Sequence, residues 1–194
     1  MTDAHSQQRQ TLAALALASP WLLPALCAAR SLRLSSWCIG AGAVRNLVWD
    51  HLHGYAQPSW LPDVDLAYFN PAAADDGQER RLQTRLRQIM PTLNWEATNQ
   101  ATVHLWLEAR FGQAVAPLAS LEQAVACWPE YATAVGLWLD EDDGVQIIAP
   151  HGLDDLFAMR VRRNPARASL ESYRQRVAEK RYRERWPQVS IEDA

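Results

Sequence analysis

Two aspartates, Asp63 and Asp65, stand two positions apart in the stretch PDVDLAYF, which is otherwise apolar. Along a β-strand, alternation places both carboxylates on one face, while Val64 and Leu66 point to the other face, into the core. Two carboxylates about 7 Å apart on one strand repel each other unless a cation lies between them. Hard divalent cations such as Mg²⁺ take oxygen ligands and keep positions for water and phosphate. The spacing therefore indicates a metal site that also binds phosphate.

A third acid follows one helix later in the chain. In the stretch NWEAT, Glu96 is an acidic residue between the apolar Trp95 and Ala97. We expect its strand to lie beside the first one, which would add Glu96 to the metal site. The simpler alternatives are that Glu96 is a surface strand residue, that Asp63 caps its strand, and that Asp65 pairs with an arginine. The face on which Glu96 lies distinguishes these readings.

Upstream of the aspartates, the stretch WCIGAGAVRN predicts a strand, a glycine turn and the start of a helix. Free N–H groups at a helix N-terminus bind anions, and glycines let a phosphate approach closely. Arg45 offers a forked donor for phosphate, or forms a structural ion pair with Asp50. The candidate nucleotide-binding residues are Gly40, Ala41, Gly42, Arg45 and Asn46.

Five further polar residues have weaker claims on a substrate. Asn99 and Gln100 lie at the end of the NWEAT strand, where they cap a helix or contact a base or acceptor. On an apolar helix face, a histidine such as His104 is usually a core residue. His151 and Asp154 lie in the stretch APHGLDDLF, where an acid such as Asp154 favours the start of a helix. We keep all five as candidate substrate contacts.

The elements that must position these residues predict an α+β protein with a mixed sheet. Strands are expected at 35–40, 63–69 and 92–98, and helices at 42–54, 78–90, 118–127 and 168–186. A further helix is expected after residue 99, with a strand in TVHLWL as the alternative. ATAVGLWL and VQIIAP flank the turn DEDDG, which predicts a late hairpin. We expect a single domain over 1–194, with N-terminal helices in 1–34, a core in 35–160 and a basic C-terminal helix in 161–194.

Composition excludes several classes of protein. The formal net charge is −3 and 48% of the residues are hydrophobic, so neither disorder nor strong nucleic-acid binding is indicated. The three cysteines form no C-x-x-C motif, which favours a reducing cytoplasm. Pro20 and Pro24 divide the apolar N-terminal run, which predicts two short helices and no membrane span. Ser19-Pro20 predicts the start of the second helix, with Ser19 as its cap. The basic segment from Arg160 to Trp186 is a solvated helix face, or a wall that binds triphosphate or an RNA acceptor.

Taken in order, these stretches resemble the nucleotidyltransferase superfamily related to DNA polymerase beta. More closely, the chain resembles a bacterial family of nucleotidyltransferases of mostly unknown substrate. The resemblance runs from about Trp37 to Trp186 and is carried by five segments: GAGAVRNLVWDHLHG, DVDLAYF, NQATVHLW, WPEYATAVG and APHGLDDLF.

The resemblance implies a transferase that moves a nucleoside monophosphate from a triphosphate such as ATP to an acceptor hydroxyl. It implies two Mg²⁺ ions, with Mn²⁺ as a substitute, held by Asp63, Asp65 and Glu96. The acceptor is a small molecule, a protein side chain or an RNA end.

Two departures from the superfamily pattern support an alternative, a nucleotide-binding or regulatory module without turnover. The usual Gly-Ser or Gly-Gly is Gly40-Ala41 here, so no hydroxyl is available at this turn. The segment HGYAQPSWLP also lengthens the gap before Asp63, and we expect it to form a loop over the site.

Overall fold

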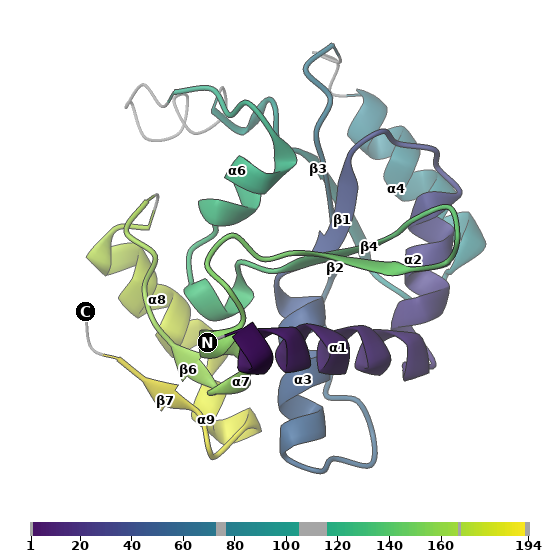
Figure 1. The fold of residues 1–194 in the computed structure, drawn as a ribbon. Coiled ribbons are helices and arrows are strands. Elements are labelled where there is room, and N and C mark those ends of the chain that lie inside the picture. Colours follow the sequence, from purple (N-terminus) through teal and green to yellow (C-terminus); the bar gives the residue numbers. More distant parts are fainter. Residues whose placement is uncertain (1, 73–76, 105–115, 167, 193–194) are drawn as a thin grey trace.

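The computed structural model describes residues 2–72, 77–104, 116–166 and 168–192. Its centre is a five-stranded sheet with the strand order β3-β2-β1-β4-β5 (Figure 1). The strands are β1 (Trp37–Gly40), β2 (Val64–Tyr68), β3 (Trp95–Asn99), β4 (Gly136–Leu139) and β5 (Val145–Ile148). β2 and β3 are parallel and the other pairs are antiparallel, which confirms the predicted mixed sheet and late hairpin.

Four helices cover one face of the sheet and enclose the main core. They are α1 (Thr2–Ala18), α2 (Leu22–Arg30), α3 (Gly42–Leu52) and α4 (Gly77–Ile89). Their apolar side chains pack on the alternate strand residues Ile39, Leu66 and Leu137, which are fully buried. At the start of α2 the Ser19 hydroxyl accepts a hydrogen bond from Leu22 N at 3.1 Å, the predicted cap.

The N-terminal helices bear on the question of a membrane span. No single helix in the described part of the chain is long and apolar enough to cross a membrane. α1 and α2 pass that test only when they are taken together, and they meet at a bend of 87°.

The opposite face of the sheet has a smaller apolar cluster and the candidate site. Cys38 and Ala67 from the strands pack against Leu121 and Val125 of α6 (Leu121–Ala126). Since side chains alternate along a strand, the residues on this face include Gly40 and Asp65. One face of the sheet therefore supplies the core, and the other presents the polar residues.

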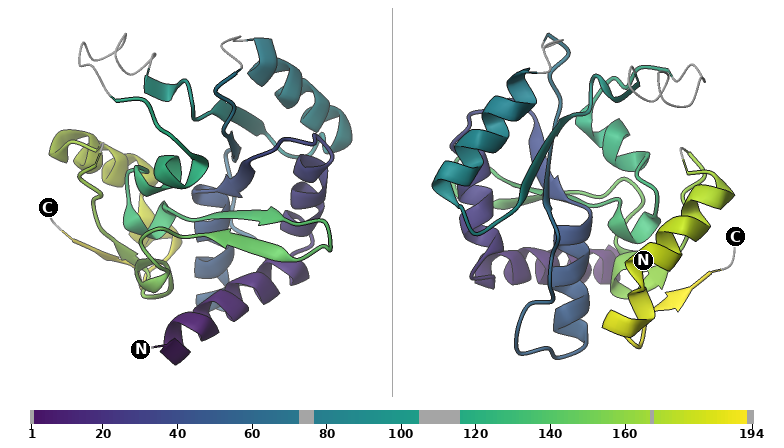
Figure 2. Two further views of the ribbon diagram at one scale, coloured as in Figure 1. Left: turned by 45° about the horizontal axis from the view of Figure 1, so that its top comes forward. Right: turned by 180° about the vertical axis from the view of Figure 1, so that it is seen from behind.

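The C-terminal segment forms a layer on the side of α6, away from α2 and α4 (Figure 2). It contains α7 (Asp154–Phe157), α8 (Leu170–Lys180), α9 (Tyr182–Arg185) and the short parallel strands β6 (Arg160–Val161) and β7 (Ser190–Ile191). A 3₁₀ turn, η1 (Tyr131–Thr133), connects α6 to β4.

The prediction of one continuous C-terminal helix from Ala168 to Trp186 was wrong. Arg181 has a φ of 49°, a left-handed conformation that ends α8 and begins α9. The break turns Tyr182 and Trp186 inward, where both rings pack edge-on against Trp49. The burial of these two rings explains why the helix is interrupted at Arg181. The spacing of charged residues along the helix does not predict this interruption.

The helix predicted after Asn99 lies largely outside the described residues. The described part shows a turn in which Thr102 N donates to Asn99 O at 3.2 Å. Beyond His104, residues 105–115 lie outside the described part of the chain.

Candidate active site

The two strands that carry the acids are paired so that the acids meet. Asp65 of β2 is the direct register partner of Glu96 of β3. Parallel neighbours directly opposite each other direct their side chains to the same face, so the two carboxylates share one face. Asp63 lies two residues before Asp65, at the entrance to β2, and alternation places it on the same side. The sheet thus places Asp65 and Glu96 side by side, and Asp63 directly precedes β2.

The electrostatics of Asp65 reflect this crowding. Burial, followed by the charges of Asp63 and Glu96, raises the pKa of Asp65 from 3.8 to about 6. The cations Arg176 and Lys180 oppose the rise in part. In the described part of the chain, neither Asp63 nor Asp65 forms a side-chain ion pair. The acids are therefore not held in ion pairs with arginines, and the nearby cations compensate for their repulsion only in part.

The acids suit a divalent cation in their donor chemistry. All three offer carboxylate oxygens, which Mg²⁺ prefers, and a bound cation would remove the repulsion that raises the pKa of Asp65. Among the described residues, however, no three His, Cys, Asp or Glu side chains stand close enough to enclose an ion as they are placed. Glu96 is exposed, so its side chain is free to turn toward the other two.

The glycine turn beside the acids is tightly constrained. A Cβ on Gly40 would lie 2.5 Å from the Trp128 ring and 2.8 Å from Val135 O, so this position accepts only glycine. Ala41 has a φ of 51° and a ψ of −119°, in a region that favours glycine. α3 begins at Gly42 without a side-chain cap, which leaves its first N–H groups free for an anion.

The Arg45 side chain is buried. Its side chain is 2% exposed, and its Nη2 donates to Asn46 Oδ1 at 2.7 Å. The guanidinium carbon lies 5.1–5.5 Å from the ring centroids of Trp49, Tyr182 and Trp186, an arrangement that favours cation–π attraction. Burial lowers the pKa of Arg45. Asn46 in turn donates to Trp60 O, so both residues help to hold the loop before β2.

The long segment before Asp63 forms a wall of the site. Ser59 donates to Asp50 through its N–H (2.7 Å) and its hydroxyl (2.6 Å), and Arg185 Nη2 donates to Trp60 O at 2.5 Å. The backbone of this loop is thus held from two sides. The Trp60 ring is 76% exposed at the rim.

Two cavities lie along α8, beside the acids and the glycine turn. The first, of about 200 Å³, is lined by Asp65, Ala41, Gln100 and Arg176, among other residues. The second, of about 400 Å³, is lined by Asp63, Gly42, Trp60 and Lys180, and also by Arg45, Arg181 and Arg185. One turn of α8 separates Arg176 from Lys180, so successive turns of a basic helix face successive acids.

Lys180 lies close to other positively charged side chains. Burial, followed by the charges of Arg176 and Arg45, lowers the pKa of Lys180, and Asp63 acts in the opposite direction. An anion bound in the second cavity would relieve this repulsion. The site therefore combines acids suited to metal with a wall of mixed charge, in which the cations Arg45, Lys180, Arg181 and Arg185 lie beside Glu179 and Glu184.

The weaker candidates separate clearly in space. Gln100 lines the first cavity, and Asn99 fixes the chain after β2, since its Oδ1 accepts from Asn70 N at 3.0 Å. His104 is half-buried, and His151 contacts Ala126 O through Nε2 at 2.8 Å. Asp154 accepts from Gln8 of α1 at 3.1 Å. Of these five residues, only Gln100 lines either of the two cavities.

Sequence reasoning missed three residues of this region. Arg176 and Lys180 were noted only as part of a basic helix, although their spacing of four residues places them on one face. Glu130 drew no attention, yet it is 1% exposed and contacts Arg176. An acid inside the apolar stretch CWPEYATAV was the available signal.

A larger cavity of about 600 Å³ lies at the far ends of β1 and β4. Its lining includes Arg30, Trp37, Trp138 and Asp140, and it contains none of the predicted site residues. It is therefore separate from the candidate active site.

A mixed sheet flanked by helices, with Asp65 and Glu96 paired next to a glycine turn that opens a helix, is the arrangement expected of a nucleotidyltransferase. The chain belongs to a nucleotidyltransferase family, whose sequence profile matches residues 27–191. It is an enzyme of this class, which acts on a nucleoside triphosphate and an acceptor.

One solved structure agrees with this assignment. The chain is similar to an NMR structure described as a CCA-adding enzyme head domain, with a TM-score of 0.81 and 28% identity. That match covers 95% of this chain and 96% of the other. A tRNA-processing enzyme in an apo form matches with a TM-score of 0.49 and 17% identity, over 87% of this chain and 44% of the other. No curated protein sequence matches the chain.

Proposed function

We propose that the protein transfers a nucleoside monophosphate from a nucleoside triphosphate to an acceptor hydroxyl, with Mg²⁺ bound by Asp63, Asp65 and Glu96. The observation that carries this proposal is the direct pairing of Asp65 with Glu96, beside an unpaired Asp63 and below a basic helix. Acids without protein partners at this depth are unfavourable unless a ligand compensates for them. The residues thus favour a metal-dependent reaction.

The roles of the chain's own residues follow from their positions. The free N–H groups at the start of α3 bind phosphate oxygens, and the turn at Gly40 lets the phosphate approach the backbone. Lys180 and Arg176 neutralise the phosphates from the opposite wall. Holding the triphosphate between these groups orients it for attack by the acceptor. The bound metal supplies the positive charge that favours an ionised acceptor hydroxyl and a leaving pyrophosphate.

The acceptor is the open part of the proposal. The similar structure is described as a CCA-adding enzyme head domain, which makes an RNA end the first acceptor to test. Small molecules and protein side chains are the other two classes. Cys27, Cys38 and Cys127 are all unpaired, which supports a reducing compartment such as the cytoplasm.

An inactive nucleotide-binding module is the second candidate. Ala41 favours it, because this turn lacks the hydroxyl that the superfamily usually places there. A single set of measurements separates the two functions, since both require nucleotide binding and only one releases pyrophosphate.

The test incubates the protein with each labelled nucleoside triphosphate, Mg²⁺ and either total RNA or an RNA-free cell extract. We expect label in a discrete product and release of pyrophosphate, both lost in Asp63→Ala and Asp65→Ala. Asp142→Ala removes an exposed acid from the β4–β5 turn and serves as the matched control. If the protein binds nucleotide but releases no pyrophosphate with every triphosphate and both acceptor sources, the result would favour the inactive module.

A further inference from the structure

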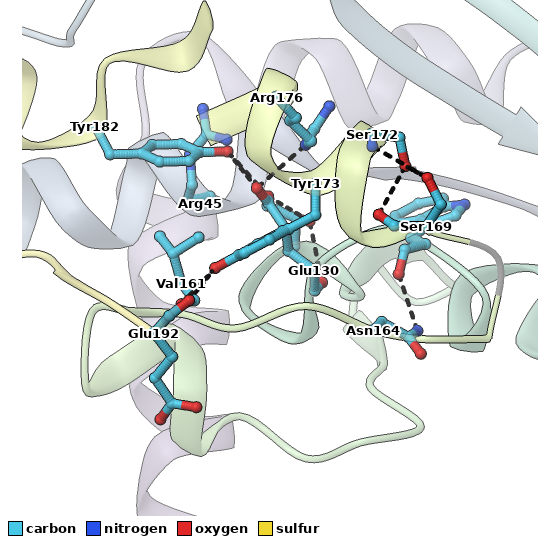
Figure 3. Close-up of polar contacts among 12 residues, drawn as sticks. Arg45, Glu130, Val161, Asn164, Ser169, Ser172, Tyr173, Arg176, Tyr182 and Glu192 are labelled. Carbon is cyan, nitrogen blue, oxygen red and sulfur yellow. Dashed lines mark hydrogen bonds and ion pairs between the residues drawn. The ribbon is translucent and has the colours of Figure 1, made fainter. Parts of the chain in front are cut away.

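Glu130 is a buried acid that contacts Tyr182 and Arg176 of the C-terminal helices (Figure 3). Its carboxylate accepts from the Tyr182 hydroxyl at 2.7 and 2.9 Å, and from the Thr133 hydroxyl at 3.3 Å. Arg176 Nε lies 3.2 Å from Glu130 Oε1 and forms an ion pair. With 1% exposure, this carboxylate is not available to a ligand.

Tyr182 links Glu130 to the deeper cation. Burial, followed by the charge of Glu130, raises the pKa of Tyr182, so its hydroxyl keeps the proton that it donates. The centroid of the same ring lies 5.1 Å from the guanidinium carbon of Arg45. Glu130 therefore balances two cations, Arg45 inside the core and Arg176 at the cavity.

Arg176 lies between the first cavity and Glu130. It comes from α8, lines the cavity that contains Asp65 and Ala41, and contacts Glu130 behind the cavity. The contact is an ion pair at Nε, whose N–H is not aligned for a hydrogen bond, so Glu130 attracts this edge of the guanidinium through its charge. The two terminal nitrogens remain as donors for an anion in the cavity that Arg176 lines.

We propose that Glu130 is a positioning residue, which orients Arg176 so that its terminal nitrogens bind the phosphates of a nucleoside triphosphate beside Asp65. This inference rests on the proposed function and adds to it. Glu130 does not touch the substrate, and its negative charge would repel a phosphate that approached it. Its effect on binding passes through Arg176 alone.

A purely structural role is the competing explanation. Through Tyr182, Glu130 also fastens α9 to the body of the protein, and its loss would lower stability whatever the role of Arg176. The two explanations differ in their effect on ligand affinity when Arg176 is already absent. A double-mutant cycle measures that difference.

The experiment compares wild type, Glu130→Gln, Arg176→Gln and the double variant by calorimetric titration. The ligands are a non-hydrolysable nucleoside triphosphate analogue with Mg²⁺, and inorganic tripolyphosphate without metal. We expect each single change to weaken both affinities about tenfold, and the double variant to bind no more weakly than Arg176→Gln. Folding of every variant is checked by urea unfolding.

Tyr182→Phe provides the matched control, because it removes a hydrogen bond to Glu130 and leaves the ion pair intact. We expect it to lower stability while both affinities stay within twofold of wild type. Unchanged affinity in Glu130→Gln, or a further tenfold loss when this change is added to Arg176→Gln, would overturn the positioning role. If the wild type binds neither ligand, the positioning role and the proposed function both fail. Coupling that appears with tripolyphosphate, in a protein that does not bind the nucleotide analogue, would contradict only the proposed function.

Discussion

Two groups of buried or half-buried acids lie near the C-terminal helices, and their surroundings are opposite. Glu130 and Asp50 have protein partners for their oxygens: Tyr182, Thr133 and Arg176 for the first, Ser59 and Trp186 for the second. The charges of Asp63 and Glu96 act on Asp65, and in the described part of the chain neither Asp63 nor Asp65 forms an ion pair with a protein cation. The paired acids hold the fold together, and the unpaired acids keep their charge for a ligand.

The backbone shows the same contrast. Ala41, beside the unpaired acids, has a positive φ that disfavours any residue except glycine. Around Asp50, the loop and α9 are joined by regular hydrogen bonds, including Trp186 Nε1 to Asp50 Oδ1 at 2.7 Å. Ala41 therefore places unfavourable backbone energy where the ligand is expected.

The largest effect that would test this contrast is on turnover. We expect Asp65→Asn to reduce nucleotidyl transfer by about 1,000-fold, equivalent to about 4 kcal/mol in the barrier, because the metal loses a ligand. Pyrophosphate release measures the loss, with Asp142→Asn as the control. Near-normal turnover in Asp65→Asn would remove the distinction between the two groups of acids.

Asp50→Ala should have the next largest effect, and on stability. The change leaves the Trp186 indole N–H and the Ser59 N–H without their acceptor, and we expect a loss of about 3 kcal/mol in the free energy of unfolding. Urea unfolding at pH 7 measures it. A loss below about 0.5 kcal/mol, the size expected for an exposed acid, would show that the pairing of Asp50 contributes little.

The pH dependence of stability should depend on Asp65 in the absence of metal. Its folded pKa, about 6, lies above its ordinary value of 3.8, so folding favours the protonated form. Stability therefore falls as pH rises from about 4 to about 6 and stays low above that range. We expect Asp65→Asn to be more stable than wild type by about 3 kcal/mol at pH 8, and equal to it at pH 3.5.

Thermal unfolding across this pH range, with EDTA, tests the expectation. Saturating Mg²⁺ should reduce the difference at pH 8, because the bound ion favours the ionised wild-type carboxylate. A difference that is the same at every pH would show that Asp65 is not under electrostatic strain.

The smallest expected effect is at the turn. Ala41→Gly should raise the free energy of unfolding by about 1 kcal/mol, because glycine adopts a positive φ without the steric cost of a Cβ. Gly40→Ala is the opposite control, since its Cβ would lie 2.5 Å from the Trp128 ring and should destabilise the protein. Chemical unfolding of both variants measures the pair, and a destabilised Ala41→Gly would contradict the strain at this position.

Much of this organisation was predictable from short stretches of sequence. The period of two in PDVDLAYF placed β2, the turn residues of DEDDG placed the β4–β5 hairpin, and Ser19-Pro20 marked the junction before α2. These features depend on neighbours a few residues apart, so backbone geometry and alternation suffice. The α+β class with a mixed sheet was confirmed in the same way.

The surroundings of individual side chains were not predictable to the same extent. Arg45 was expected near phosphate or paired with Asp50, and it lies among three aromatic rings, two of them contributed by residues about 140 positions later. The C-terminal helix was expected to be continuous, and it breaks at Arg181 so that Tyr182 and Trp186 can be buried. Both outcomes depend on packing between distant segments.

The amino-acid order by itself determined where two acids would share a strand face and where a glycine turn would open a helix, because those are consequences of local backbone geometry. Tertiary structure decided that Glu96 pairs with Asp65, that Arg176 and Lys180 face the acids, and that Glu130 lies behind them. Strand register and helix docking are set by burial of apolar surface across the whole core, and no short segment contains that information.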